Sequence, residues 1–245
     1  MTQWVILSGI EGNLAAYEAV MADIKRQKTW VEALYILGDV VGPTPECEKL
    51  INRIRNPKSD ELEPQVCQGW WEEQTLILHG LGRIGEPVDL IERYGKSTVQ
   101  SLWKSVSRPS VEWMRSLDFG FFELDCLLIH GSTLGVDDEL TPQTPPLQMI
   151  DRVMRMGANN LFCGRSGLAF QYQLQEGSVS TAVTTLDSVQ AAQTVTTSPR
   201  QVIGVGNVGR ELGKATYTLY NPYTNQLEFR TIRYGSGKGF QSRKP

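Results

Sequence analysis

The strongest constraint on the fold is a repeated pattern in which a short apolar run ends in a glycine-containing loop. The first run is Trp4 to Leu7, and a helical spacing of apolar residues follows from Leu14 to about Gln27. A second run, residues 33–37, ends at Gly38. Strand, helix and strand at this spacing predict a parallel sheet with right-handed crossovers. With 245 residues, the chain is long enough for one large α/β domain.

The pattern continues beyond the first crossover. Further buried strands are predicted at 76–78, 125–129 and 160–163, and helices at 45–55 and 147–156. Residues 87–117 carry two helical blocks that Pro109 separates, with Ser110 as a start signal for the second. After Leu168 polar and apolar residues alternate and Thr and Tyr become frequent, which predicts antiparallel strands joined by hairpins. Because there is no long linker, we expect one domain over residues 1–234. We expect the Gly- and Lys-rich residues 235–245 to form a flexible tail.

The composition excludes several classes of function. A net charge of −3 and a pI near 5.5 argue against a nucleic-acid partner, which needs a basic face. The sequence lacks the roughly 20-residue apolar stretch that spans a bilayer, so no membrane association is expected. The four cysteines are far apart and form no CxxC pair, and no basic lead-in marks a signal peptide. We therefore expect buried thiols and a cytoplasmic protein. With only two histidines, a site built mainly from imidazole ligands is excluded.

The candidate site lies where the strands end. In a parallel sheet, ligands bind beyond the carboxyl ends of the strands, and glycines in the loops let the backbone approach them closely. The polar side chains that these loops offer come from well-separated parts of the chain: Glu11, Asp39, Arg83, His130, Ser132, Arg165 and Ser166.

The order and spacing of the loops resemble the calcineurin-like metallophosphoesterase superfamily, in particular its small prokaryotic single-domain branch. That family carries the loops D-x-H-G-N, G-D-x-x-G, G-N-H-D, V-H-G-S and G-H-T-H, and a late N-x-G-S-V-G. The corresponding segments here are 9–13, 38–42, 80–83, 129–132, 164–167 and 204–209. The resemblance implies a four-layer αββα sandwich, with a parallel-rich first sheet and an antiparallel C-terminal sheet.

The metal ligands that the resemblance implies are largely missing. Family members hold two metals with seven side chains, of which Asp39 and His130 are retained. The other positions carry residues that are poor or non-equivalent ligands: Gly9, Glu11, Leu81, Arg165 and Gly167. The histidine that assists the leaving group in the family falls on Gly82. Such a set cannot assemble a two-metal clamp, and Asp39 and His130 are left as remnants of a metal site.

Two carboxylates close together in a partly dry pocket are costly unless a cation compensates them. We therefore predict that Arg165, together with Arg83, pairs with Asp39 or Glu11 and fills part of the metal volume. The predicted pocket comprises one residue or more from each loop: Glu11, Asn13, Asp39, Arg83, His130, Ser132, Arg165 and Asn207.

Simpler roles for these residues stay open. Asp39 could serve a turn, and Glu11 could complement a helix dipole. His130 could be a buried neutral imidazole bonded to the backbone, and Arg165 could lie on the surface.

Three functions remain in competition. The first is a pseudo-phosphoesterase without a cofactor, whose pocket binds a phosphate-like small anion or a protein partner. The second is an active phosphoesterase that hydrolyses phosphomonoesters or phosphodiesters with a single Mn, Fe, Zn or Mg ion held by Asp39, His130 and Glu11. The third is a purely structural or interaction role.

Overall fold

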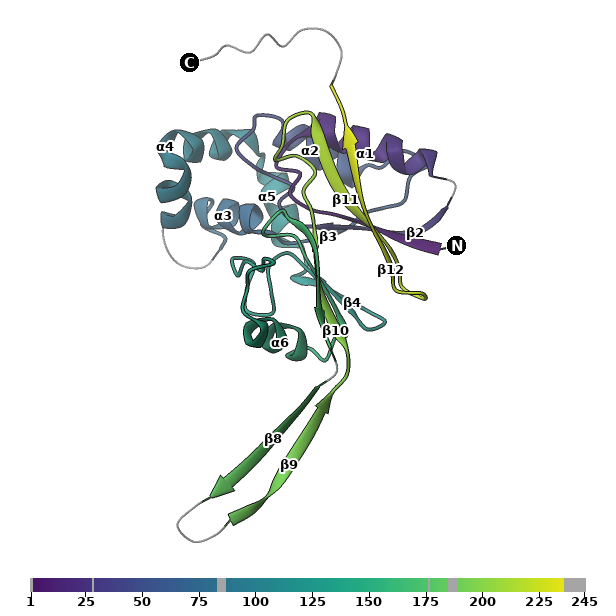
Figure 1. Ribbon diagram of the computed structural model, residues 1–245. Helices are drawn as coiled ribbons and strands as arrows, with labels where there is room; N and C mark the ends of the chain where they lie inside the picture. The colour runs from purple at the N-terminus through teal and green to yellow at the C-terminus, as the bar shows by residue number, and fades with distance from the viewer. Residues whose placement is uncertain (1, 28, 83–86, 176, 185–188, 236–245) are drawn as a thin grey trace, which may run out of the picture.

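A computed structural model describes residues 2–27, 29–82, 87–175, 177–184 and 189–235 (Figure 1). In these residues two five-stranded sheets are stacked on one another. The first sheet has the order β12-β11-β1-β2-β3, in which β1, β2 and β3 are parallel, β11 is antiparallel to β1, and β12 is antiparallel to β11. Its strands are β1 (Thr2–Leu7), β2 (Trp30–Leu37), β3 (Gln65–Cys67), β11 (Lys214–Asn221) and β12 (Gln226–Arg233).

The second sheet has the order β4-β5-β6-β10-β7, in which β5, β6 and β10 are parallel and the edge strands β4 and β7 are antiparallel. Its strands are β4 (Gly120–Glu123), β5 (Cys126–Ile129), β6 (Asn160–Cys163), β7 (Ala169–Leu174) and β10 (Arg200–Val205). A separate hairpin, β8 (Gly177–Thr184) and β9 (Val189–Thr197), projects from the body between β7 and β10 (Figure 1).

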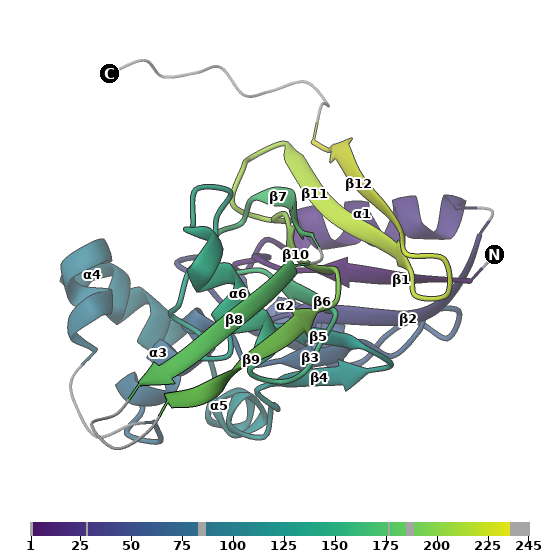
Figure 2. The ribbon, with the colours of Figure 1, turned by 60° about the horizontal axis from the view of Figure 1, so that its bottom comes forward.

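Helices cover the outer faces of the two sheets (Figures 1 and 2). One apolar cluster packs the first sheet against helices α1 to α5, and another packs the second sheet against α6. A third cluster, including Ile6 and Phe162, fills the space between the sheets. The resulting order of layers is the predicted αββα sandwich. The helices are α1 (Leu14–Arg26), α2 (Cys47–Arg55), α3 (Trp70–Leu78), α4 (Val88–Ser105), α5 (Arg108–Arg115) and α6 (Pro146–Met154).

Most C-terminal strands pair antiparallel, as predicted, but β10 is parallel to β6. They do not form one C-terminal sheet. Strands β11 and β12 extend the first sheet, β7 and β10 belong to the second, and β8 and β9 form the separate hairpin. None of the described helices is long and apolar enough to cross a membrane.

One predicted strand is wrong. Residues 76–78 form the end of helix α3, and the third strand of the sheet is Gln65–Cys67. Helix α3 is buried on several sides, so its apolar residues have no clear helical period. A short buried apolar run is compatible with either structure, which explains the error. The two helical blocks predicted within 87–117 are α4 and α5, and the second begins after Ser107 rather than at Ser110. Residues 236–245, which include most of the predicted tail, lie outside the described residues.

Candidate functional site

The loops after β1 and β2 bring two carboxylates together. Glu11 N–H donates to the carbonyl of Asp39 over 2.8 Å, and Gly12 N–H donates to the carbonyl of Val40 over 2.7 Å. Glu11 and Asp39 both have positive φ angles, 50° and 53°. Non-glycine residues in this region cost on the order of 1 kcal/mol each and persist where the surrounding contacts hold them. The tight loops therefore place both side chains at one edge of the sheet.

Arg210 neutralises this pair. Its Nε lies 2.6 Å from Glu11 Oε1, and its Nη2 lies 2.9 Å from Asp39 Oδ2. Its Nη1 donates to the carbonyl of Arg165 over 3.1 Å. Burial alone would lower the pKa of Arg210, but the Glu11 and Asp39 carboxylates outweigh it and raise that pKa. All three guanidinium nitrogens thus have partners, and the group stays charged.

The prediction that Arg165 pairs with the carboxylates is wrong, because Arg210 takes that role. Arg165 is only 8% exposed, so it is not a surface residue either. Its Cζ lies 4.6 Å from the centroid of the Trp70 ring, and Arg93 lies 5.5 Å from the same ring. The Nε of Arg165 is buried without a hydrogen-bond partner among the described residues. Burial lowers the pKa of Arg165, and the charge of Asp39 opposes that effect.

Two glycines make room for Arg210. A Cβ on Gly9 would come within 3.1 Å of Arg210 Nε, and one on Gly167 within 2.6 Å of Nη1. Asn207 links Arg210 to the loop that contains Gly167. Its Oδ1 accepts a hydrogen bond from the backbone N–H of Arg210, and its Nδ2 donates to the Gly167 carbonyl. The guanidinium therefore occupies space that side chains at positions 9 and 167 would need. An arginine just after the late glycine-rich loop was the available signal for this residue, and the sequence analysis missed it.

His130 is completely buried beside Asp39. Its Nδ1 lies 2.7 Å from the Leu37 carbonyl, which can only accept, so Nδ1 carries a proton. Its Nε2 lies 3.3 Å from Asp39 Oδ1 and makes no hydrogen bond to any described residue. Burial lowers the pKa of His130, and the charge of Asp39 acts in the opposite direction. The backbone-bonded role that the sequence left open for His130 is thus present, next to the carboxylate.

Glu72 is a further site residue that the sequence analysis missed. Its buried carboxylate accepts hydrogen bonds from the N–H groups of Asp39 (2.8 Å), Val41 (3.0 Å) and Gly69 (2.9 Å). Burial and the nearby Asp39 charge raise the pKa of Glu72 to about 7. This carboxylate ties the start of α3 to the loop after β2. A glycine followed three residues later by Glu, at the start of a helix, was the signal that could have revealed it.

Comparisons with known proteins bear on the fold. No family model and no curated protein matches the chain. Among solved structures, hypothetical protein PH1004 from Pyrococcus horikoshii OT3 is similar, with a TM-score of 0.71 and 20% identity over 96% of this chain and 90% of that one. A metallophosphoesterase from Sphaerobacter thermophilus matches with a TM-score of 0.65 and 16% identity, over 96% of this chain and 89% of that one. The chain has the calcineurin-like metallophosphoesterase fold. Identities this low establish the fold alone.

Within this metallophosphoesterase fold, the third motif loop lies at Gly69–Glu72 rather than at 80–83. It directly follows β3, whereas Leu81 and Gly82 lie beyond the end of α3. The assignment of the family's catalytic histidine to Gly82 is therefore wrong. In the corrected register Trp70 and Trp71 stand at the two middle positions of the G-N-H-D motif.

The remaining predicted pocket residues have other roles. Ser132 Oγ bonds to Asp138 and accepts from Leu134 N–H, so its hydroxyl serves its own loop. Asn13 caps helix α1 through Ala16 N–H and donates to the Gly209 carbonyl. Arg83 lies outside the described residues. Of the predicted set, Glu11, Asp39 and His130 lie together in the site. Asn207 is not one of this group, but it accepts a hydrogen bond from the backbone N–H of Arg210.

The side chains present do not fit the two-metal centre of the fold. In the described part of the chain, no group of three or more His, Cys, Asp or Glu residues is placed to hold a metal ion. Glu11 and Asp39 each direct an oxygen at Arg210, and Glu72 is saturated by backbone N–H groups. A guanidinium that cannot lose its proton thus stands among the oxygens that a metal would need.

Proposed function

We propose that this chain is a metallophosphoesterase-like protein in which Arg210 replaces the metal centre, and which binds a phosphate-like anion without hydrolysing esters. The observation that carries the proposal is the pairing of Arg210 with Glu11 (2.6 Å) and Asp39 (2.9 Å). Charge-assisted hydrogen bonds of this kind are about twice as strong as neutral ones, so the arrangement is well fixed.

The chemistry of the paired groups supports the absence of hydrolysis. A water nucleophile needs a base or a metal to activate it. Both carboxylates are held by a permanent cation, and the remaining basic nitrogen, His130 Nε2, is completely buried. A general base must instead be free to accept a proton from water within hydrogen-bond distance.

Arg165 and Arg93 support the binding of an anion. Their guanidinium groups lie 4.6 and 5.5 Å from the Trp70 ring, so the aromatic ring orients both. Arg165 has a buried Nε without a partner among the described residues, and Arg93 is exposed. Planar guanidinium groups with available N–H donors suit phosphate and carboxylate oxygens.

Two measurements test the proposal. Metal analysis of protein purified without chelator, and phosphomonoester and phosphodiester assays with added Mn²⁺, should give no stoichiometric metal and no turnover above the Asp39→Ala variant. Inorganic phosphate should raise the melting temperature of the native chain. Arg165→Leu should lose that shift, whereas Arg108→Leu, at a side chain that is 87% exposed, should keep it.

An active enzyme with one metal is the second candidate. The observation in its favour is the buried Nε2 of His130, which lacks a hydrogen bond to a described residue and lies 3.3 Å from Asp39 Oδ1. Turnover that requires Mn²⁺ and disappears in Asp39→Ala would favour this candidate over the first.

We also propose a reducing, cytoplasmic location, which the four buried free thiols support: Cys47, Cys67, Cys126 and Cys163. The pocket could instead bind a protein partner. Titration with phosphate distinguishes the two cases, because only a site for a small anion would let phosphate raise the melting temperature of the isolated chain.

A further inference from the structure

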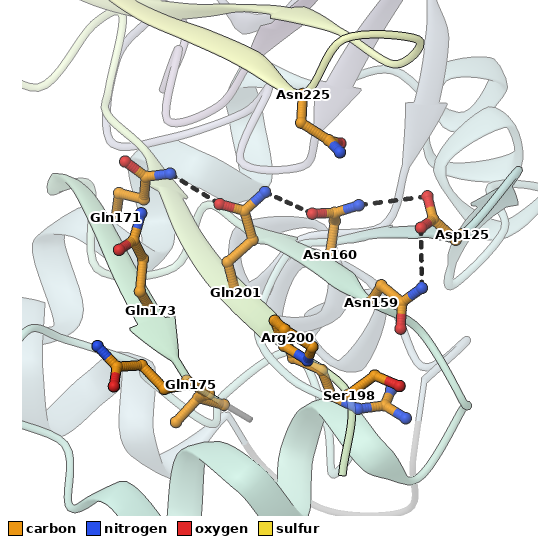
Figure 3. Close-up of a pocket in the computed structure, with 12 residues that line it drawn as sticks. Asp125, Asn159, Asn160, Gln171, Gln173, Gln175, Ser198, Arg200, Gln201 and Asn225 are labelled. Atoms are coloured by element: carbon orange, nitrogen blue, oxygen red, sulfur yellow. Dashed lines mark hydrogen bonds between the residues drawn. The ribbon is translucent and has the colours of Figure 1, made fainter. Parts of the chain in front are cut away.

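A polar cavity of about 590 Å³ lies at the root of the β8–β9 hairpin (Figure 3). Its residues come from β7, β10, the start of β6, the turn before β5 and the turn between β11 and β12. None of them belongs to the site around Arg210. Most of the polar side chains are primary amides, which distinguishes this cavity from the charged site at the carboxyl ends of the strands.

A chain of hydrogen-bonded amides forms the floor of the cavity (Figure 3). Gln171 donates to Gln201 Oε1 over 2.7 Å, and Gln201 in turn donates to Asn160 Oδ1. Asn160 donates to Asp125 Oδ1 over 3.2 Å, and Asn159 donates to the other oxygen of Asp125 over 3.0 Å. These residues lie on neighbouring strands, since Gln201 is the register partner of Asn160.

The carboxylate of Asp125 determines the direction of the whole chain. A carboxylate only accepts, so Asn160 must direct its NH₂ group to Asp125 and its oxygen to Gln201. The same reasoning orients Gln201 and then Gln171. Each donation toward the negative charge makes the next amide oxygen a better acceptor. The chain of amides therefore ends in an oriented, polarised Gln171 oxygen.

Other amides of the cavity are free. Gln173 lies on the same face of β7 as Gln171, and Gln175 directly follows the strand; both side chains are exposed and form no hydrogen bond to a described residue. Asn225 reaches toward the floor from the β11–β12 turn, where its oxygen accepts from the Tyr220 hydroxyl (2.6 Å), leaving its NH₂ group available (Figure 3). The cavity thus combines a fixed floor with unoccupied donors and acceptors.

The charges and the lining define the class of ligand. Asp125 and Arg200 carry opposite charges, so the lining has no net charge that would select an anion or a cation. An apolar ligand would remove water from the amides without replacing their hydrogen bonds. A nucleobase would need an aromatic surface, and the described lining residues include no aromatic ring. Hydroxyl groups both donate and accept, as the amides do.

We propose that this cavity binds an uncharged polyhydroxylated ligand, of the sugar or cyclitol type. The volume of about 590 Å³ lies within the usual range for small-molecule sites. Gln171 and Gln201 orient hydroxyl groups at the floor, and Gln173 and Asn225 contact the ligand from the sides. Because the floor is already hydrogen-bonded, little ordering is needed on binding.

The test is a titration of the ¹⁵N-labelled full chain with glucose, myo-inositol, sucrose and maltohexaose, observed through the side-chain NH₂ signals. We expect saturable shifts of the Gln173 and Gln201 signals with at least one probe, and no such shifts with inorganic phosphate. Gln173→Ala should weaken binding by about three- to tenfold, as expected for one lost hydrogen bond. Gln100→Ala, an exposed glutamine on α4, is the matched control and should bind like the native chain.

The arms of the experiment also separate the sources of the ligand. Tighter binding of glucose, inositol or sucrose indicates a free small molecule, whereas tighter binding of maltohexaose indicates a glycan end. The proposal is overturned if none of the four probes shifts these signals at about 50 mM, a concentration that detects even weak binding. Equal weakening by Gln173→Ala and Gln100→Ala, or binding of phosphate or of an uncharged peptide in place of the sugars, also overturns it. Failure here leaves the proposal for Arg210 intact, because the two sites share no residue.

Discussion

The Arg210 site and the amide cavity are both polar regions at the ends of strands, but their polar groups are paired in different ways. In the Arg210 site, two carboxylates and a guanidinium saturate one another at 2.6 and 2.9 Å. In the cavity, a neutral amide chain ends on Asp125 and leaves the Gln173 and Gln175 amides without described partners. Buried charges must be compensated within the protein, whereas exposed amides can form their hydrogen bonds with water or with a ligand. The Arg210 ion pair is therefore a structural element, which leaves the binding of an anion to Arg165 and Arg93 beside it, whereas the amides of the cavity are themselves open to a ligand.

The largest expected effect is that of removing the guanidinium. Arg210→Met leaves Glu11 and Asp39 as adjacent carboxylates, of which Asp39 is completely buried, so we expect a loss of about 3 kcal/mol in the free energy of unfolding. Urea denaturation measures the loss. The double variant Arg210→Met/Asp39→Asn should recover part of it, and Arg108→Met is the surface control. A loss below about 1 kcal/mol in Arg210→Met would contradict the structural role of the ion pair.

A smaller loss should follow from a methyl group placed against Arg210. Gly167→Ala combines a positive φ of 68° with a Cβ only 2.6 Å from Arg210 Nη1, and we expect a loss of about 2 kcal/mol. Gly157 is the matched control, because its φ is 70° and no atom lies within 4 Å of its Cβ position. Gly157→Ala should show only the backbone cost, about 1 kcal/mol. Equal losses in the two variants would mean that Arg210 does not fill the space beside Gly167.

The pH dependence of the free energy of unfolding should reveal the raised pKa of Glu72. Its pKa in the folded protein is raised to about 7, above the ordinary value of 4.5, so the folded state binds more protons than the unfolded state between these values. The contribution of Glu72 is fully present below about pH 4.5, decreases as the pH rises to about 7, and is then constant. The difference between these two pKa values corresponds to about 3 kcal/mol, which is the upper limit of the decrease that we expect.

Denaturation of the native chain and of Glu72→Gln at pH 5 and pH 7.5 measures this contribution. The native chain should lose stability between the two pH values by more than the variant does. An identical pH dependence of the two proteins would show that Glu72 titrates normally in the folded state.

The smallest effect is expected in the amide cavity. Gln173→Ala removes an exposed side chain without a described partner, so the free energy of unfolding should change by less than about 0.5 kcal/mol. Thermal or urea denaturation beside Gln100→Ala tests this expectation. A loss of 1 kcal/mol or more would show that Gln173 supports the fold, and would remove the contrast between the open cavity and the closed site.

The sequence revealed the fold through its strongest local patterns. The continuous apolar runs at β1 and β2, each followed by a glycine loop, are unambiguous because buried parallel strands need unbroken apolar sequence. Strand β3 is only three residues long, and its sequence Gln-Val-Cys carries no such pattern. The prediction therefore placed the third strand within the buried helix α3, and the third motif loop moved with it. That single error hid Glu72 and misassigned Gly82.

The sequence by itself placed Glu11, Asp39 and His130 in one site, because each lies in the loop after a buried strand and ligand sites lie beyond the carboxyl ends of such strands. It also determined that a cation was needed, since neighbouring carboxylates repel in a dry pocket. Only the tertiary structure decided that the cation is Arg210, which lies 199 positions from Glu11 along the chain. An arginine side chain is long and flexible, so several could have reached the carboxylates. The space left by Gly9 and Gly167 and the hydrogen bond that Arg210 N–H donates to Asn207 select one of them, and such packing is visible only when the whole chain is folded.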